Sequence, residues 1–115
     1  YLDAYRAVVA ARQTLARRDE ATAIAMLEAA RTRLGRLDER YAGLARSQTA
    51  LRQASAELAD IETLIRNHDP GADGRIGDWF TASAAVWRTL DRDERHSLFN
   101  PKRLAASARL PEGGR

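Results

Sequence analysis

The sequence lacks cysteine entirely, contains only three prolines, and has no apolar run near the ~20 residues that a membrane-spanning helix requires. Without cysteine the chain can form no disulfide, no thiolate nucleophile and no cysteine-ligated zinc site. The shortage of proline leaves long stretches in which a helix need not be interrupted. We therefore expect helices and no membrane span.

The chain begins at Tyr1, without methionine, and shows no pattern typical of a signal peptide. The absence of cysteine is compatible with the cytoplasm and with a periplasm. We expect a soluble chain and favour the cytoplasm. The start at Tyr1 leaves a periplasmic location, or excision from a larger protein, open.

The residues that are present favour a single all-α domain. Of the 115 residues 44% are apolar, and 23 of these are alanine, which favours helix and lets helices approach closely. The net charge is +3, and 18 of the 19 basic residues are arginine. Basic residues are in excess at both ends, but no dense basic run predicts nucleic-acid binding by charge alone.

One stretch, residues 34–65, has the clearest helical pattern. Large apolar residues recur every seven positions, and a second set falls three or four positions away, so both sets share one face of a helix. We call this face the Leu34–Ile65 stripe. It is typical of a helix that packs along another helix, in the same chain or in a partner. The expected interface residues are Leu34, Leu37, Tyr41, Leu44, Leu51, Leu58, Ile61 and Ile65.

No proline occurs from Glu20 to Arg66, and only Gly35 and Gly43 interrupt the pattern. A continuous helix of this length would span ~70 Å, whereas a compact domain of this size is roughly 35 Å across. We therefore predict a helical hairpin with one long, coiled-coil-like helix, or a helix that bends at Gly35 or Gly43. The stripe of an overhanging helix would need a partner helix or a second copy of the chain to cover it.

The C-terminal third is expected to form a small cap of short helices. Both tryptophans and both phenylalanines lie between positions 79 and 99 and would supply an aromatic core. Asp91 and Glu94 have the spacing of a capping box, and Asn100 before Pro101 is typical of a further helix start. The predicted segments are a hairpin over 1–66, a Gly/Asp-rich loop over 67–78, the cap over 79–110 and a tail over 111–115.

The predicted loop resembles the first eight positions of an EF-hand calcium loop. Asp69 and Asp73 stand at positions one and five, followed by glycine at six and isoleucine at eight. Position three is glycine, and position twelve is Phe80 where the bidentate glutamate belongs. Calcium would thus find two carboxylates, main-chain carbonyls and Asp78. The alternative is a polar turn shaped by Pro70 and three glycines. We expect no other cofactor.

A second possible site is a basic surface near the C-terminus that would contact nucleic-acid phosphates, with the helix over 101–109 as the reading helix. Acidic residues at 91, 93 and 94 would repel DNA from the same surface. The candidate residues are Arg88, Arg92, Arg95, Lys102, Arg103 and Arg109.

The sequence offers little for catalysis. His68 and His96 are far apart, neither has a neighbour at metal-ligand spacing, and no phosphate-binding glycine loop or nucleophile elbow occurs. We expect a non-enzymatic interaction or assembly module that pairs through the Leu34–Ile65 stripe with a partner helix or a second copy. The alternatives are a basic nucleic-acid-binding module and a calcium-binding loop.

Overall fold

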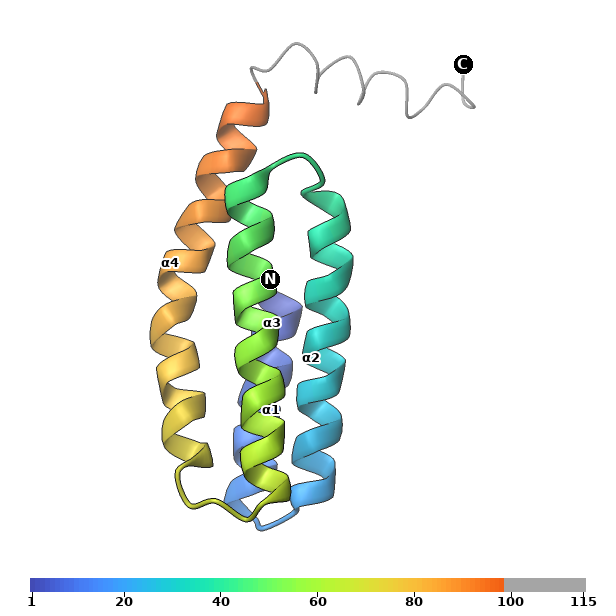
Figure 1. Cartoon of the computed structure of the whole chain (residues 1–115), viewed down its shortest axis with the longest axis vertical. Helices are drawn as coiled ribbons and strands as arrows, with labels where there is room; N and C mark the ends of the chain where they lie inside the picture. The colour runs from blue at the N-terminus through green and yellow to red at the C-terminus, as the bar shows by residue number, and fades with distance from the viewer. Residues whose placement is uncertain (99–115) are drawn as a thin grey trace, which may run out of the picture.

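The computed structural model describes the backbone of residues 1–98 and the side chains of residues 1–95. Within this range the chain forms four α-helices connected by short turns, and successive helices run in opposite directions (Figure 1). The all-α prediction is confirmed. The helices are α1 (Leu2–Ala16), α2 (Glu20–Arg40), α3 (Ala45–Arg66) and α4 (Ala72–Leu98).

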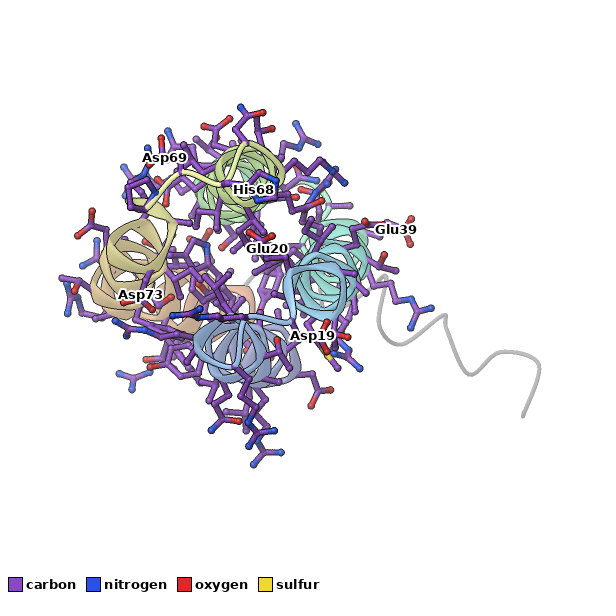
Figure 2. All side chains as sticks on the ribbon, turned by 90° about the horizontal axis from the view of Figure 1, so that it is seen from below. Asp19, Glu20, Glu39, His68, Asp69 and Asp73 are labelled. Carbon is purple, nitrogen blue, oxygen red and sulfur yellow. The ribbon has the colours of Figure 1, made fainter. Side chains whose placement is uncertain are left out.

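The four helices form a bundle rather than a flat hairpin. Seen along the bundle axis they occupy four corners, with α1 diagonally opposite α3 and α2 diagonally opposite α4 (Figure 2). Each helix packs on the helices that precede and follow it in sequence, and α1 also packs on α4, which closes the ring.

The core is built from leucine, isoleucine and alanine because alanine lets neighbouring helices approach closely while the larger side chains fill the centre. The described core residues include Ala4, Val8, Ala11, Ala23, Leu27, Ala30, Leu34, Leu51, Leu58, Ile61, Ile65, Ile76 and Trp79.

The chain does not continue as one helix from residue 20 to residue 66, so the long-helix alternative is wrong. The backbone reverses over residues 41–44, where Gly43 has φ +84°, a left-handed conformation that glycine adopts at no steric cost. The Leu44 N–H donates to the Tyr41 carbonyl oxygen at 2.9 Å and closes this turn. Gly35 instead lies inside α2. The stripe therefore folds back on itself at the second of the two glycines.

The predicted cap of short helices is also wrong as far as residue 98. α4 begins at Ala72, inside the segment predicted to be a loop, and runs without a break past Asp91 and Glu94. The capping-box spacing does not end the helix because no glycine or proline lies between residues 78 and 98. The helix and tail predicted after residue 100 lie outside the described residues.

α1 is the shortest of the described helices. α1 has 15 residues and α4 has 27, which correspond to about 22 Å and about 40 Å of helix. α2 and α3, with 21 and 22 residues, and α4 extend past the level at which α1 begins (Figure 1).

Candidate interaction site

The Leu34–Ile65 stripe lies largely inside the bundle. Five of the eight predicted interface residues are at most 1% exposed and pack within the chain's own core, where no partner reaches them in this fold; these are Leu34, Leu51, Leu58, Ile61 and Ile65. The other three are half-buried: Leu37 near the end of α2, Tyr41 and Leu44 in the turn that follows. The accessible part of the stripe is thus confined to the end of the bundle that extends beyond α1.

An aromatic cluster fills the space between α1 and α4. The Tyr1 ring stacks on Trp79, with centroids 5.8 Å apart, and meets the edge of Trp87 at 5.4 Å. Tyr5 lies 4.9 Å from Phe80 and 6.2 Å from Trp87. Because these rings are large, they connect two helices whose backbones make fewer close contacts than the other neighbouring pairs.

A chain of hydrogen bonds anchors this cluster in the core. The Ser83 hydroxyl donates to the Trp79 carbonyl oxygen at 2.9 Å, so the Tyr1 hydroxyl donates to Ser83 Oγ, 2.8 Å away. Trp79 Nε1–H donates to the Ala54 carbonyl oxygen of α3 at 3.0 Å. Burial raises the pKa of the Tyr1 phenol to about 12, because the ionised form would lose its hydration there.

The outer edge of the cluster remains exposed to solvent. Leu2 is 44% exposed and Trp87 is 42% exposed, whereas Trp79 is buried. Leu2 lies one helical turn from Tyr5, and the Trp87 ring contacts Tyr1 and Tyr5. We call Leu2, Tyr1, Tyr5 and Trp87 the Leu2–Trp87 patch. Apolar patches of this kind mark interaction sites more often than isolated exposed side chains do.

A pocket of about 330 Å³ lies between the start of α1 and α2, next to the Tyr1 side of the patch. The pocket is lined by Tyr1, Asp3, Ala4, Arg33, Arg36, Leu37 and Arg40.

At the end of the bundle where α3 begins, two polar contacts connect α4 with the C-terminal end of α2 and with α3. The Tyr41 hydroxyl donates to Glu94 Oε2 at 3.3 Å, and so connects the end of α2 with α4. Asp93 Oδ2 accepts from both the backbone N–H and the hydroxyl of Ser47, at 3.2 and 2.6 Å. Asp93 thus caps the first turn of α3 from another helix, where Leu44 supplies no side-chain cap.

The three carboxylates of the predicted calcium loop are not brought together. Asp69 accepts from the Gly71 N–H at 2.7 Å in the turn before α4. Asp73 pairs with Arg12 at 2.9 Å, and this hydrogen bond lowers the pKa of Asp73 below its usual value. Asp78 lies further along α4 and is exposed. Among the described residues no group of three or more His, Cys, Asp or Glu side chains is placed to hold a metal ion.

At the end of the bundle where α4 begins, the turn between α3 and α4 contacts the start of α2. His68, in the turn after α3, has its Nδ1 2.9 Å from a Glu20 carboxylate oxygen at the start of α2. Figure 2 shows both side chains near the bundle axis, with Asp69 and Asp73 towards α4. This contact fastens the two turns together.

The predicted nucleic-acid residues are only partly described. Arg88, Arg92 and Arg95 follow one another at spacings of four and three along α4 and are exposed on its outer side. Arg95 Nη2 lies 3.0 Å from Asp91 Oδ2, so one of the three is neutralised by its own helix. The remaining candidates, Lys102, Arg103 and Arg109, lie outside the described residues.

Sequence reasoning missed the Leu2–Trp87 patch and one buried charge. Glu62 is 1% exposed and accepts from Arg31 Nη1 at 2.9 Å, which pairs α3 with α2. The seven-residue spacing from Phe80 to Trp87 is the sequence signal that would have placed both rings on one side of a helix.

No described helix has both the length and the apolar composition required to cross a membrane. The sequence matches no family model, and comparison with curated proteins and with solved structures finds no match.

Proposed function

We propose that the chain is a non-enzymatic helical interaction module that binds a helix of another protein chain at the Leu2–Trp87 patch. The observation that carries this proposal is the exposure of two large apolar side chains, Leu2 and Trp87, at the outer edge of the aromatic cluster between α1 and α4. A helix with an apolar face would cover both side chains by packing across these two helices.

The energetics favour an occupant with an apolar face. Covering the exposed parts of Leu2 and Trp87 would contribute about 1 kcal/mol each, on the usual scale for apolar area removed from water. On the α2 side, Leu37 lines the pocket beside Tyr1 and adds half-buried apolar area. The prediction that the Leu34–Ile65 stripe mediates pairing is thus retained for its accessible end.

Site-specific photo-crosslinking tests this proposal. A photoreactive benzophenone amino acid placed at position 87 should form a covalent link to one defined polypeptide, a second copy or another chain, with the linked residues in a helical segment. The same group at the exposed position Thr81, on another side of α4, is the matched control and should not. Leu2→Ser should reduce the yield at position 87. Equal yields at the two positions would contradict the proposal.

A second candidate function is phosphate binding by Arg88, Arg92 and Arg95, which share the outer side of α4. Salt separates the two functions because phosphate contacts weaken steeply as salt concentration rises, whereas apolar contacts do not. Under this alternative Arg88→Glu abolishes binding to an oligonucleotide and Trp87→Ser does not. The interaction module predicts no salt-sensitive oligonucleotide binding at all.

A further inference from the structure

The outer surface formed by α3 and α4 is hollowed. Two adjoining pockets, of about 260 Å³ and about 380 Å³, lie there and share Ala50, Gln53 and Thr89 in their linings. Ala85 of α4 lines the first of these pockets together with Gln53 of α3, so the two residues lie at a similar level along the bundle. We call the outer surface that carries these residues the α3–α4 face.

The α3 half of this face is basic at one end and acidic at the other. Arg46, Gln53 and Asp60 are exposed and follow one another at seven-residue spacing, which places them on the same side of the helix. Arg46 and Asp60 are 14 residues apart, which corresponds to about 21 Å along the helix. Glu57, close to Asp60, lines the first pocket and adds a second carboxylate to the acidic end.

The α4 half has the same charges at the same ends. Asp78, Ala85 and Arg92 are exposed and also follow one another at seven-residue spacing. α4 runs in the opposite direction to α3 (Figure 1), and Asp93 contacts the Ser47 hydroxyl at 2.6 Å. Arg92 therefore lies at the end of the bundle where α3 begins, and Asp78 lies at the other end.

These charges are not neutralised within the described part of the chain. Arg46 and Arg92 lie at one end of the face, Asp60 and Asp78 lie at the other, and none of the four forms an ion pair with another described residue. Arg75 lies one turn before Asp78, so the acidic end carries three carboxylates against one guanidinium. The α3–α4 face thus has a basic end, an uncharged middle and an acidic end.

We propose that the α3–α4 face binds a second copy of the chain, related to the first by a two-fold axis that crosses the middle of the face at right angles to the helices. This rotation reverses the direction of the bundle. It brings Arg46 to Asp60 of the partner subunit and Arg92 to Asp78 of the partner subunit, and each contact occurs twice. Two bundles packed in the same direction would instead place like charges against one another, which is unfavourable.

A second copy fits this face better than an unrelated chain for two reasons. An unrelated chain would need acidic and basic groups about 21 Å apart on two neighbouring helices, and the chain's own face already carries them at that spacing. The small side chain of Ala85 lies halfway between the charged ends of α4, so the two copies of α4 can approach closely where they cross the axis.

This inference does not depend on the proposed function. Ala85 and Trp87 are two residues apart on α4 and therefore point in nearly opposite directions. The face is about 20 Å wide, since two helices lie side by side, and is smaller than a standard stable interface. We therefore expect a weak dimer with a Kd of about 10–100 µM at low salt.

Sedimentation of the full chain over concentrations from about 5 to about 500 µM at low salt tests for this dimer, because mass action favours it as concentration rises. Wild-type chain should change from monomer to dimer across this range. Ala85→Glu places two like charges together at the axis and should leave the chain monomeric. Ala84→Glu is the matched control, because Ala84 is equally exposed but points about 100° away, and this variant should dimerise as the wild type does.

Two charge-reversed variants test which ends meet. Arg46→Glu with Arg92→Glu makes both ends of the face acidic, and Asp60→Arg with Asp78→Arg makes both ends basic. All four positions are exposed, so both variants should keep their helical circular dichroism. Each variant alone should have a Kd at least about tenfold higher than the wild type, because like charges now meet. An equimolar mixture of the two should form dimers again, because acidic ends then meet basic ends.

A wild-type chain that stays monomeric throughout the range would overturn the proposal. Dimers that persist in both charge-reversed variants, or a mixture that fails to recover, would equally overturn the two-fold arrangement. Photo-crosslinking at position 87, performed at about 1 µM where this dimer is scarcely populated, is read separately. Its success or failure bears on the Leu2–Trp87 patch, and sedimentation bears on the α3–α4 face.

Discussion

At the scale of single residues, Tyr1 connects α1 to α4 through both its ring and its hydroxyl. Its ring lies against Trp79 and Trp87, and its hydroxyl donates to Ser83. Burial is the largest cause of its raised pKa, the Ser83 hydrogen bond opposes the shift, and the nearby Glu57 carboxylate adds to it. The neutral phenol is therefore the form that the folded chain holds.

This raised pKa predicts a loss of stability in alkaline solution. The unfolded chain releases the Tyr1 proton near pH ~10, a typical value for tyrosine, whereas the folded chain keeps it until about pH 12. The stabilisation that this phenol contributes to folding is complete below its unfolded-state pKa and is lost as the pH rises through its folded-state pKa. Absorbance titration should show a late-ionising phenol that is missing in Tyr1→Phe, and the melting temperature of Tyr1→Phe should fall less between these pH values.

If Tyr1→Phe kept the late phase, another phenol would be responsible and the hydrogen-bonded cluster would not be its origin. Ser83→Ala is the matched control. When the phenol ionises, the Ser83 hydroxyl turns from the Trp79 carbonyl oxygen and donates to the phenolate, which favours the ionised form. Ser83→Ala removes this donor and leaves the ring stacking in place, so it should raise the titration midpoint further as long as the ring stays buried.

Two buried polar residues show why side-chain pairs between helices could not be predicted from the sequence. Glu62 and Ser47 are polar residues that are buried because Arg31 and Asp93 reach them from other helices. Helical periodicity assigns a residue to a face but does not say which residue 31 or 46 positions away will lie opposite it. These partners become identifiable only when the register between helices is known.

At the scale of helices, α3 depends on α4 for its start. Its first turn has no side-chain cap of its own, and the Asp93 carboxylate accepts from the Ser47 N–H and hydroxyl. A carboxylate is favourable at this position because the first N–H groups of a helix have no partner within the helix and carry partial positive charge.

Asp93→Ala should therefore lower the free energy of unfolding by about 1–2 kcal/mol, as loss of a helix cap usually does. Chemical denaturation monitored by circular dichroism measures the change. Asp91→Ala is the matched control, because Asp91 makes an exposed pair with Arg95 on its own helix, for which about 0.5 kcal/mol or less is expected. Equal effects of the two substitutions would mean that Asp93 does not act as a cap.

The sequence predicted the existence of the helices better than their limits. The apolar pattern from residue 34 to residue 65 correctly indicated helix on both sides of the turn. Gly35 and Gly43 looked equivalent, since glycine costs a helix about 1 kcal/mol wherever it stands. Packing decides that the chain reverses at Gly43, because this reversal brings Leu34 of α2 and Leu51 of α3 into the same core. The spacing of Asp91 and Glu94 likewise suits a cap or a continuing helix.

At the scale of the whole molecule, four described helices surround the core over the length of α1, and α2, α3 and α4 surround it beyond that length. Amides in the four-helix part, such as those near Ile61 and Ile76, should exchange with solvent only on global unfolding. Amides near Leu37 and Leu90 should exchange through smaller openings. Native-state hydrogen exchange in low denaturant measures this gradient, and uniform protection along α4 would contradict it.

The candidate site was beyond sequence reasoning for a related reason. Trp87 and Leu2 are recognisable in the sequence as apolar residues on helices, but their exposure follows from how α1 packs on α4. That packing is set by the Arg12–Asp73 pair, the aromatic cluster and the turns together. No local pattern encodes it.

The ring of helices also has a consequence for the order in which the chain acquires its structure. Three of the four packed pairs join neighbours in sequence through short turns, so most contacts form between residues close along the chain. Topologies of this kind reach the native state within microseconds to milliseconds. Among the packed helix pairs, α1 with α4 is the pair that is most distant in sequence, and the tyrosines and tryptophans that form this junction would report its closing step by their fluorescence.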